Sequence, residues 1–122
     1  MNKQDILNIE ALITQYFEGL FFGDIIKLKG CFHKNAYLYG DIHGEAYEKS
    51  IEQYLEGVEA RKSPRDLKEA FDMKLIGLDI MGKIAMAKVH VPMLGYNYYD
   101  YLSLSQQDGK WKIVNKIFTH MA

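Results

Sequence analysis

The segment from Asn97 to Phe118, NYYDYLSLSQQDGKWKIVNKIF, combines apolar stretches with an acid, an amide and several tyrosines. Its centre, Asp108–Gly109, is the strongest short signal for a two-residue hairpin turn. Pairing outward from that turn places Asp100, Tyr98 and Asn115 on one face, because directly paired residues share a face. A carboxylate on a partly apolar wall loses hydration, so its pKa rises and suits proton transfer near neutral pH. We therefore take Asp100, Tyr98 and Asn115 as the candidate catalytic group.

Asp100 also has two simpler interpretations. It can be a structural carboxylate that accepts a hydrogen bond from Tyr98 or from a backbone amide, or it can contact a ligand without catalysing a reaction. His90, in a neighbouring predicted strand, becomes an acid/base partner for Asp100 only if its side chain faces inward. The sequence leaves these alternatives open.

The face that carries Asp100 is otherwise apolar, and we assign it to the concave, helix-covered side of a sheet. An apolar pocket with a few convergent polar groups is the expected form of a ligand site. The predicted ligand-contacting residues are Tyr16 and Tyr54 from two helices, His90, and Leu102, Trp111, Ile113 and Ile117 from this face. The large aromatic side chains can either line such a pocket or fill it.

The opposite face of the hairpin carries Tyr99, Tyr101, Val114 and Phe118, flanked by lysines. This mixture suits a partner subunit better than bulk water, so we expect a homodimer through the outer face of the sheet. A slip of one residue in the hairpin pairing would exchange the two faces.

The run GDIHGEAYE spaces Asp41, His43 and Glu45 two residues apart, which on an extended strand would aim all three the same way. Such a set can hold a divalent metal. Gly40 and Gly44 within the run favour a turn instead. We therefore predict no metal site there.

The composition predicts one domain, residues 1–122, whose 48% hydrophobic residues can form a core without metal or disulfide staples. The net charge of −1 and the scattered basic residues argue against nucleic-acid or membrane binding. Cys31 is the single cysteine, and we interpret it as a small buried hydrophobe. No signal-peptide layout, long apolar run or nucleotide-binding fingerprint occurs, so we expect a cytoplasmic protein without a cofactor.

The hydrophobic spacing predicts three helices followed mainly by strands. Apolar residues recur every three or four positions from Ile6 to Leu20, then Gly23 can end that helix and Asp24 can begin a second, short one. A strand is predicted at 36–42, and the pair Ser50 and Gln53 forms a capping box at the third helix. From residue 69 onward the period changes to two, which predicts a meander of four strands and an α+β fold with a mostly antiparallel sheet.

Two segments resemble a known fold family. The run ITQYFEGLFFGDIIKLKGCFHKNAYLYG resembles the opening of nuclear-transport-factor-like proteins, which share a cystatin-like fold, and DYLSLSQQDGKWKIVNKIF resembles the closing hairpin of their SnoaL-like or "putative lumazine-binding" branch. The resemblance implies a cone in which a curved sheet wraps an N-terminal helix and leaves an apolar cavity at its open end. It also implies frequent dimerisation through the outer face of the sheet.

Members of that family include isomerases, dehydratases, hydrolases and proteins that only bind, so fold alone assigns no reaction. Our first hypothesis is a domain that binds a small apolar or aromatic molecule in the concave pocket. The second is a cofactor-free isomerase, dehydratase or hydrolase with Asp100 as general base. The third is a protein-interaction domain whose cavity is filled by side chains.

Overall fold

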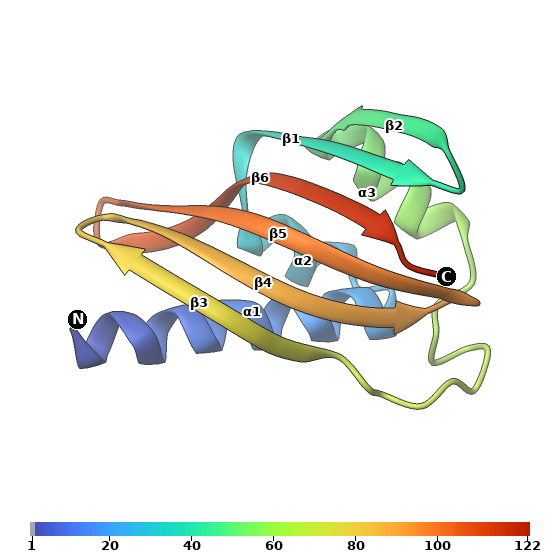
Figure 1. Cartoon of the computed structure of the whole chain (residues 1–122), viewed down its shortest axis with the longest axis horizontal. Coiled ribbons are helices and arrows are strands. Elements are labelled where there is room, and N and C mark those ends of the chain that lie inside the picture. Colours follow the sequence, from blue (N-terminus) through green and yellow to red (C-terminus); the bar gives the residue numbers. More distant parts are fainter. Residues whose placement is uncertain (1) are drawn as a thin grey trace.

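The computed structural model describes residues 2–122 as one sheet with three helices against it. The helices are α1 (Lys3–Phe22), α2 (Ile25–Cys31) and α3 (Ile51–Ala60). The strands are β1 (Phe32–Ile42), β2 (Glu45–Ser50), β3 (Lys74–Met81), β4 (Ile84–Met93), β5 (Tyr96–Gln107) and β6 (Lys110–His120). Figure 1 shows the strands as one curved layer in front of all three helices. The predicted α+β class, a curved sheet wrapped around an N-terminal helix, is confirmed.

The strands follow the order β2-β1-β6-β5-β4-β3 across the sheet. Only β1 and β6 run parallel to each other in the described chain, and the other neighbours are antiparallel. Strand β2 was not predicted. Its sequence, EAYEKS, lies at the edge of the sheet and remains largely exposed, so it lacks the apolar alternation by which strands are recognised.

The helix ends follow the predicted capping chemistry. Gly23 ends α1 with φ of 65°, a left-handed conformation that glycine adopts without steric cost. The Asp24 side chain then accepts hydrogen bonds from the first amides of α2. At α3, Ser50 and Gln53 exchange both hydrogen bonds of a capping box. The three predicted helix starts and stops are therefore confirmed.

The core lies between α1 and the concave face of the sheet, which we call the inner face. The buried stripe of α1 contains Ile9, Leu12, Ile13, Tyr16, Phe17, Leu20 and Phe21. The inner face of the sheet contributes a second set of side chains that are nearly inaccessible to solvent: Leu38, Ala87, Val89, Leu102, Leu104, Trp111 and Ile113. Because residues directly paired across strands share a face, these side chains form continuous rows under the helix.

The pairing of β5 with β6 contains a β-bulge that the sequence analysis did not predict. Near the turn the pairing is as predicted, with Gln106 opposite Trp111 and Leu104 opposite Ile113. The next pair is Ser103 with Asn115, so β6 has one extra residue, Val114, at this point. A bulge of this kind bends the strand and changes which face the following residues occupy.

Beyond the bulge the predicted faces of β6 are wrong. Lys116 now pairs with Leu102 and Phe118 with Asp100, so both belong to the inner face. Asn115 and Ile117 move to the outer face, and Ile117 is 44% exposed there. Gly40 of β1 makes the inward turn of Phe118 possible, since any Cβ at residue 40 would overlap the Phe118 ring.

Candidate functional site

Asp100 lies in the middle of β5 with its side chain on the inner face, only 2% exposed. The hydroxyl group of Tyr16, from α1, donates a hydrogen bond of 2.7 Å to its Oδ2 atom. The hydrogen bond therefore joins the central helix to the sheet across 84 residues of sequence. The sequence analysis named Tyr98 or a backbone amide as the hydrogen-bond donor to a structural Asp100. In the structure the side-chain donor is Tyr16 instead.

Lys116 is the second charged side chain of this buried group, and it is 4% exposed. Its Nζ atom lies 3.8 Å from Asp100 Oδ2 and donates a hydrogen bond of 3.3 Å to the hydroxyl oxygen of Tyr54. The same ammonium lies 5.3, 4.7 and 5.2 Å from the ring centres of Tyr16, Tyr54 and Phe118. Aromatic faces attract a cation, so the rings partly replace the water that Lys116 has lost.

Burial shifts the proton affinity of this group. Loss of hydration raises the pKa of Asp100 above its usual value, while the Lys116 cation and the Tyr16 hydrogen bond oppose that rise. Burial and the neighbouring Asp100 carboxylate hold the pKa of Tyr16 well above 10, so Tyr16 stays a hydrogen-bond donor. A carboxyl group of raised pKa, a phenol that donates a hydrogen bond and a cation therefore lie within one contact network.

A pocket of about 70 Å³ opens beside these groups, at the end of the sheet away from the β5–β6 turn. We call it the inner pocket. Its lining consists of Ile42, Tyr47, Tyr54, Arg61, Val91, Met93, Tyr98, Asp100, Lys116 and Phe118. The wall is mainly apolar and aromatic, with one carboxylate and two cationic side chains, the composition expected of a small-molecule site.

The structure brings together only part of the predicted site. Asp100, Tyr98 and Tyr54 line the inner pocket. Tyr16 contacts Asp100 directly through its hydroxyl group but belongs to the core beneath the pocket. These four side chains come from α1, α3 and β5, which the fold packs against one another.

Three predicted site residues lie away from the inner pocket. Asn115 faces outward after the bulge and donates a hydrogen bond of 3.1 Å to the backbone oxygen of Tyr37. Ile117 follows it to the outer face. His90 also faces outward, where its ring stacks on that of Tyr99 with centres 4.4 Å apart, so it does not serve as a partner for Asp100.

Leu102, Trp111 and Ile113 face inward as predicted but fill the core instead of lining the pocket. Trp111 lies near the start of α1, where its Nε1 atom donates a hydrogen bond of 3.3 Å to Asp5. The apolar face predicted for the hairpin thus divides into a packed part near the turn and an open part near Asp100.

The sequence analysis missed the two cations and two of the aromatic side chains of the inner pocket. Lys116 and Phe118 were assigned to the outer face, and Tyr47 lies on the unpredicted strand β2. Arg61 directly follows α3, and the sequence analysis assigned no role to it. The one available signal is in β6, where the alternation of Trp111 and Ile113 stops at a polar Asn115.

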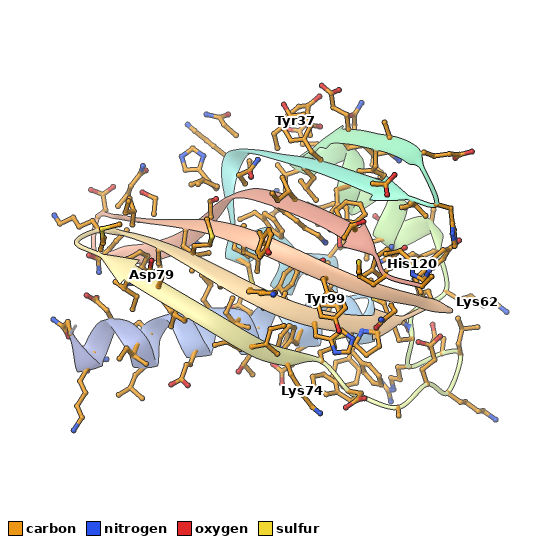
Figure 2. All side chains as sticks on the ribbon, in the orientation of Figure 1. Tyr37, Lys62, Lys74, Asp79, Tyr99 and His120 are labelled. Atoms are coloured by element: carbon orange, nitrogen blue, oxygen red, sulfur yellow. The ribbon has the colours of Figure 1, made fainter. Side chains whose placement is uncertain are left out.

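A larger hollow of about 670 Å³ lies on the outer face of the sheet. Side chains around it include Lys88, Tyr99, Tyr101, Ile117 and Thr119. Figure 2 labels Tyr99 here, over the middle of the sheet. Asp100 also borders this hollow, but Lys116 and Arg61 do not, and several of its walls are partly exposed apolar side chains.

The remaining candidates of the sequence analysis show no reactive arrangement. His43 and Gly44 form the turn between β1 and β2, and residues 2–122 contain no cluster of three or more metal-ligating side chains. Burial raises the pKa of the Cys31 thiol to about 12, which makes it a poor nucleophile. Within the same residues, no helix is both long enough and apolar enough to cross a membrane.

Comparison with known proteins gives the family of this chain. Residues 4–119 match the family described as "Putative lumazine-binding". The chain belongs to this family. One curated relative, the aldolase FrzH of Cladobotryum sp., is 29% identical over 103 residues, which cover 84% of this chain and 81% of the relative.

Solved structures show the same fold as this member of the "Putative lumazine-binding" family. An NTF2-like protein of unknown function from Methylobacillus flagellatus KT is 23% identical, with a TM-score of 0.89 over 100% of this chain and 96% of its own. A cystatin-like fold protein from Burkholderia xenovorans LB400 is 15% identical, with a TM-score of 0.73 over 99% and 95% of the two chains. The predicted nuclear-transport-factor-like, cystatin-like fold is confirmed.

The Asp100–Lys116 pair makes a prediction about stability. Asp100→Asn leaves the Lys116 ammonium buried without its carboxylate, and we expect a loss of about 3–5 kcal/mol in the free energy of unfolding. The double variant Asp100→Asn/Lys116→Met, which removes both charges, should recover most of that loss. Urea denaturation at pH 7 of the parent protein, Asp100→Asn, Lys116→Met and the double variant gives the coupling energy between the two charges. A loss in the double variant equal to the sum of the losses in the two single variants would show that the two charges do not interact.

Proposed function

We propose that this chain binds a small molecule in the inner pocket, with Asp100 and Lys116 as the polar groups that it meets there. The observation that carries the proposal is a buried carboxylate and a buried ammonium on the wall of a mainly apolar and aromatic hollow. Isolated charges are buried at a high free-energy cost, and perturbed ionisable groups in a cleft are typical of functional sites. Membership in the family described as "Putative lumazine-binding" supports ligand binding without naming this chain's ligand.

A steric test distinguishes the inner pocket from the outer hollow. Ile42 is a half-buried member of the inner wall, and Ile117 lies on the outer face. We expect Ile42→Trp to fill the inner pocket and abolish binding of small aromatic and aliphatic fragments detected by ligand-observed NMR. The same change at Ile117 should leave those fragments bound. If no fragment distinguishes Ile42→Trp from the parent protein, the inner pocket is not a binding site.

A second candidate is a cofactor-free enzyme that moves a proton on the bound molecule. It is favoured by the distance of 3.8 Å between Asp100 Oδ2 and Lys116 Nζ, which sets a base beside a cation. In such a reaction the Asp100 carboxylate would take a proton from the carbon next to a carbonyl group. The C–H electron pair would move toward the carbonyl oxygen, and the Lys116 ammonium would stabilise the enolate that results. The name of the aldolase relative fits this chemistry.

Proton exchange tests the second candidate without knowledge of the true substrate. In deuterated water, the parent protein should speed the loss of the α-proton NMR signals of one or more simple ketones or 2-oxo acids. Asp100→Asn should slow that exchange by about 100-fold or more, the usual contribution of a general base. Asp79→Asn, at an exposed position labelled in Figure 2, is the matched control and should leave the rate unchanged. Equal rates in both variants would argue against Asp100 as a base.

We also propose that the outer face of the sheet pairs with a second copy of the chain. Tyr39, Ile117 and Tyr101 stand side by side on β1, β6 and β5, each 44–45% exposed, and form a continuous apolar row. Of the residues first expected to contact the partner, Tyr99 and Tyr101 belong to this face, whereas Phe118 is replaced by Ile117. Val114 is the half-buried bulge residue.

Light scattering after size exclusion measures this association. The parent protein should have the mass of a dimer, and Tyr101→Glu should shift it toward the monomer because a charge would then be desolvated at the contact. Ile26→Glu, at an exposed position on α2, is the control and should remain dimeric. A monomeric parent protein would contradict the proposal.

A further inference from the structure

One cationic side chain of the inner pocket has a buried atom without a partner. Arg61 follows the last turn of α3 in an extended conformation, with φ of −97° and ψ of 159°, and lines the pocket. Its Nη2 atom is buried and has no hydrogen-bond acceptor among residues 2–122, the single such side-chain atom in that range. Arg61 also takes part in none of the salt bridges found there. A buried donor of this kind costs free energy unless an acceptor reaches it.

The charges around the inner pocket do not balance. Asp100 is matched by Lys116, at 3.8 Å between Oδ2 and Nζ. Arg61 adds a second positive charge, because a guanidinium stays protonated in proteins. The remaining lining residues are tyrosines and apolar side chains, which carry no charge at neutral pH. The pocket therefore has an excess of one positive charge.

The surroundings of Arg61 provide further donors. Burial raises the pKa of Tyr47 to about 12, and the neighbouring Arg61 cation opposes that rise. Burial also raises the pKa of Tyr98, again against the effect of Arg61. The guanidinium thus lies near two protonated phenols, and phenols and guanidinium can all donate hydrogen bonds to one acceptor group.

We propose that the molecule bound in the inner pocket carries a carboxylate, and that Arg61 is the residue that recognises it. A carboxylate is planar and singly charged, which matches both the guanidinium fork and the excess of one charge. A phosphate monoester carries about two negative charges near neutral pH, more than this pocket neutralises. The inference rests on the proposed function, since it names the class of ligand for the same site. The apolar part of the ligand would lie on the aromatic wall, with its other end toward Asp100 and Lys116.

The test compares two probes of nearly equal shape, butanoate and its neutral analogue butanamide, titrated into the ¹⁵N-labelled full chain at pH 7. Butanoate should shift the amide signals of Tyr98, Asp100 and Lys116 and bind more tightly than butanamide. Arg61→Gln should weaken butanoate by about tenfold or more, the usual effect of losing one hydrogen bond to a charged group, and leave butanamide unchanged. Arg61→Lys, which keeps the charge but loses the fork, should weaken butanoate by a smaller factor.

Arg65→Gln is the matched control, because Arg65 is exposed and lies over the Phe22 ring, 5.4 Å from its centre. It should bind butanoate as the parent protein does. Equal binding of both probes, or equal effects of the Arg61 and Arg65 changes, overturns the proposal. Another outcome is that the parent protein binds the neutral fragments that Ile42→Trp excludes and yet fails to bind butanoate. That result would overturn the carboxylate inference and leave the proposed binding site in the inner pocket intact. The melting temperature of Arg61→Gln separates a loss of butanoate binding from unfolding. If Arg61→Gln does not fold, the butanoate affinity of Arg61→Lys, compared with that of the parent protein, tests the proposal.

Discussion

Between Ile113 and Asn115, strand β6 holds one residue more than the part of β5 that it pairs with. This bulge at Val114 determines the content of the inner pocket, since it turns Lys116 and Phe118 inward next to Leu102 and Asp100. Bulges also increase local twist and bend the strand. At the same level the pairing of β1 with β6 is irregular too, between Phe32 and Tyr37. The bulge in β6 thus accompanies both the bend of the sheet and the contact between the Lys116 cation and the Asp100 carboxylate.

The buried pair of Asp100 and Lys116 is costly for a small domain, because both charges lose their hydration. The pKa of Asp100 is raised although a cation lies 3.8 Å from the carboxylate, so desolvation outweighs the attraction between the charges. A buried pair in this balance adds little to stability compared with apolar side chains of similar volume. The aromatic rings around Lys116 and the hydrogen bond from Tyr16 reduce the cost without removing it. An arrangement that stability alone does not favour supports the proposed contact with a ligand.

The sequence predicted those parts of the fold whose signals are local. The capping box at Ser50, the left-handed Gly23 and the Asp108–Gly109 turn each depend on residues close together in the chain, and each is present. The hairpin register was correct as far as the turn geometry controls it, up to the pair of Leu104 with Ile113. The inward face of Asp100 followed from that count along β5, which has no bulge.

The parts that were missed depend on contacts between distant segments. This bulge has no distinct side-chain signature in the sequence, so every assignment in β6 beyond Val114 was shifted by one face. The Tyr16 hydroxyl group meets Asp100 only once α1 packs into the curved sheet. Arg61 resembles any charged residue at a helix end until the strands β2 and β5 bring Tyr47 and Tyr98 next to it.

The two hollows of the sheet differ in the kind of partner that they suit. The outer one is about ten times larger, yet most of its wall consists of exposed or half-exposed side chains. Electrostatic contacts there are screened, so specific recognition must come from shape and apolar area, as in an interface between proteins. In the inner pocket the charges are shielded from solvent, and each is therefore stronger in its effect on a bound molecule. A small volume with one unmatched positive charge selects by charge and size together, which is the property that a small-molecule site requires and a protein interface does not.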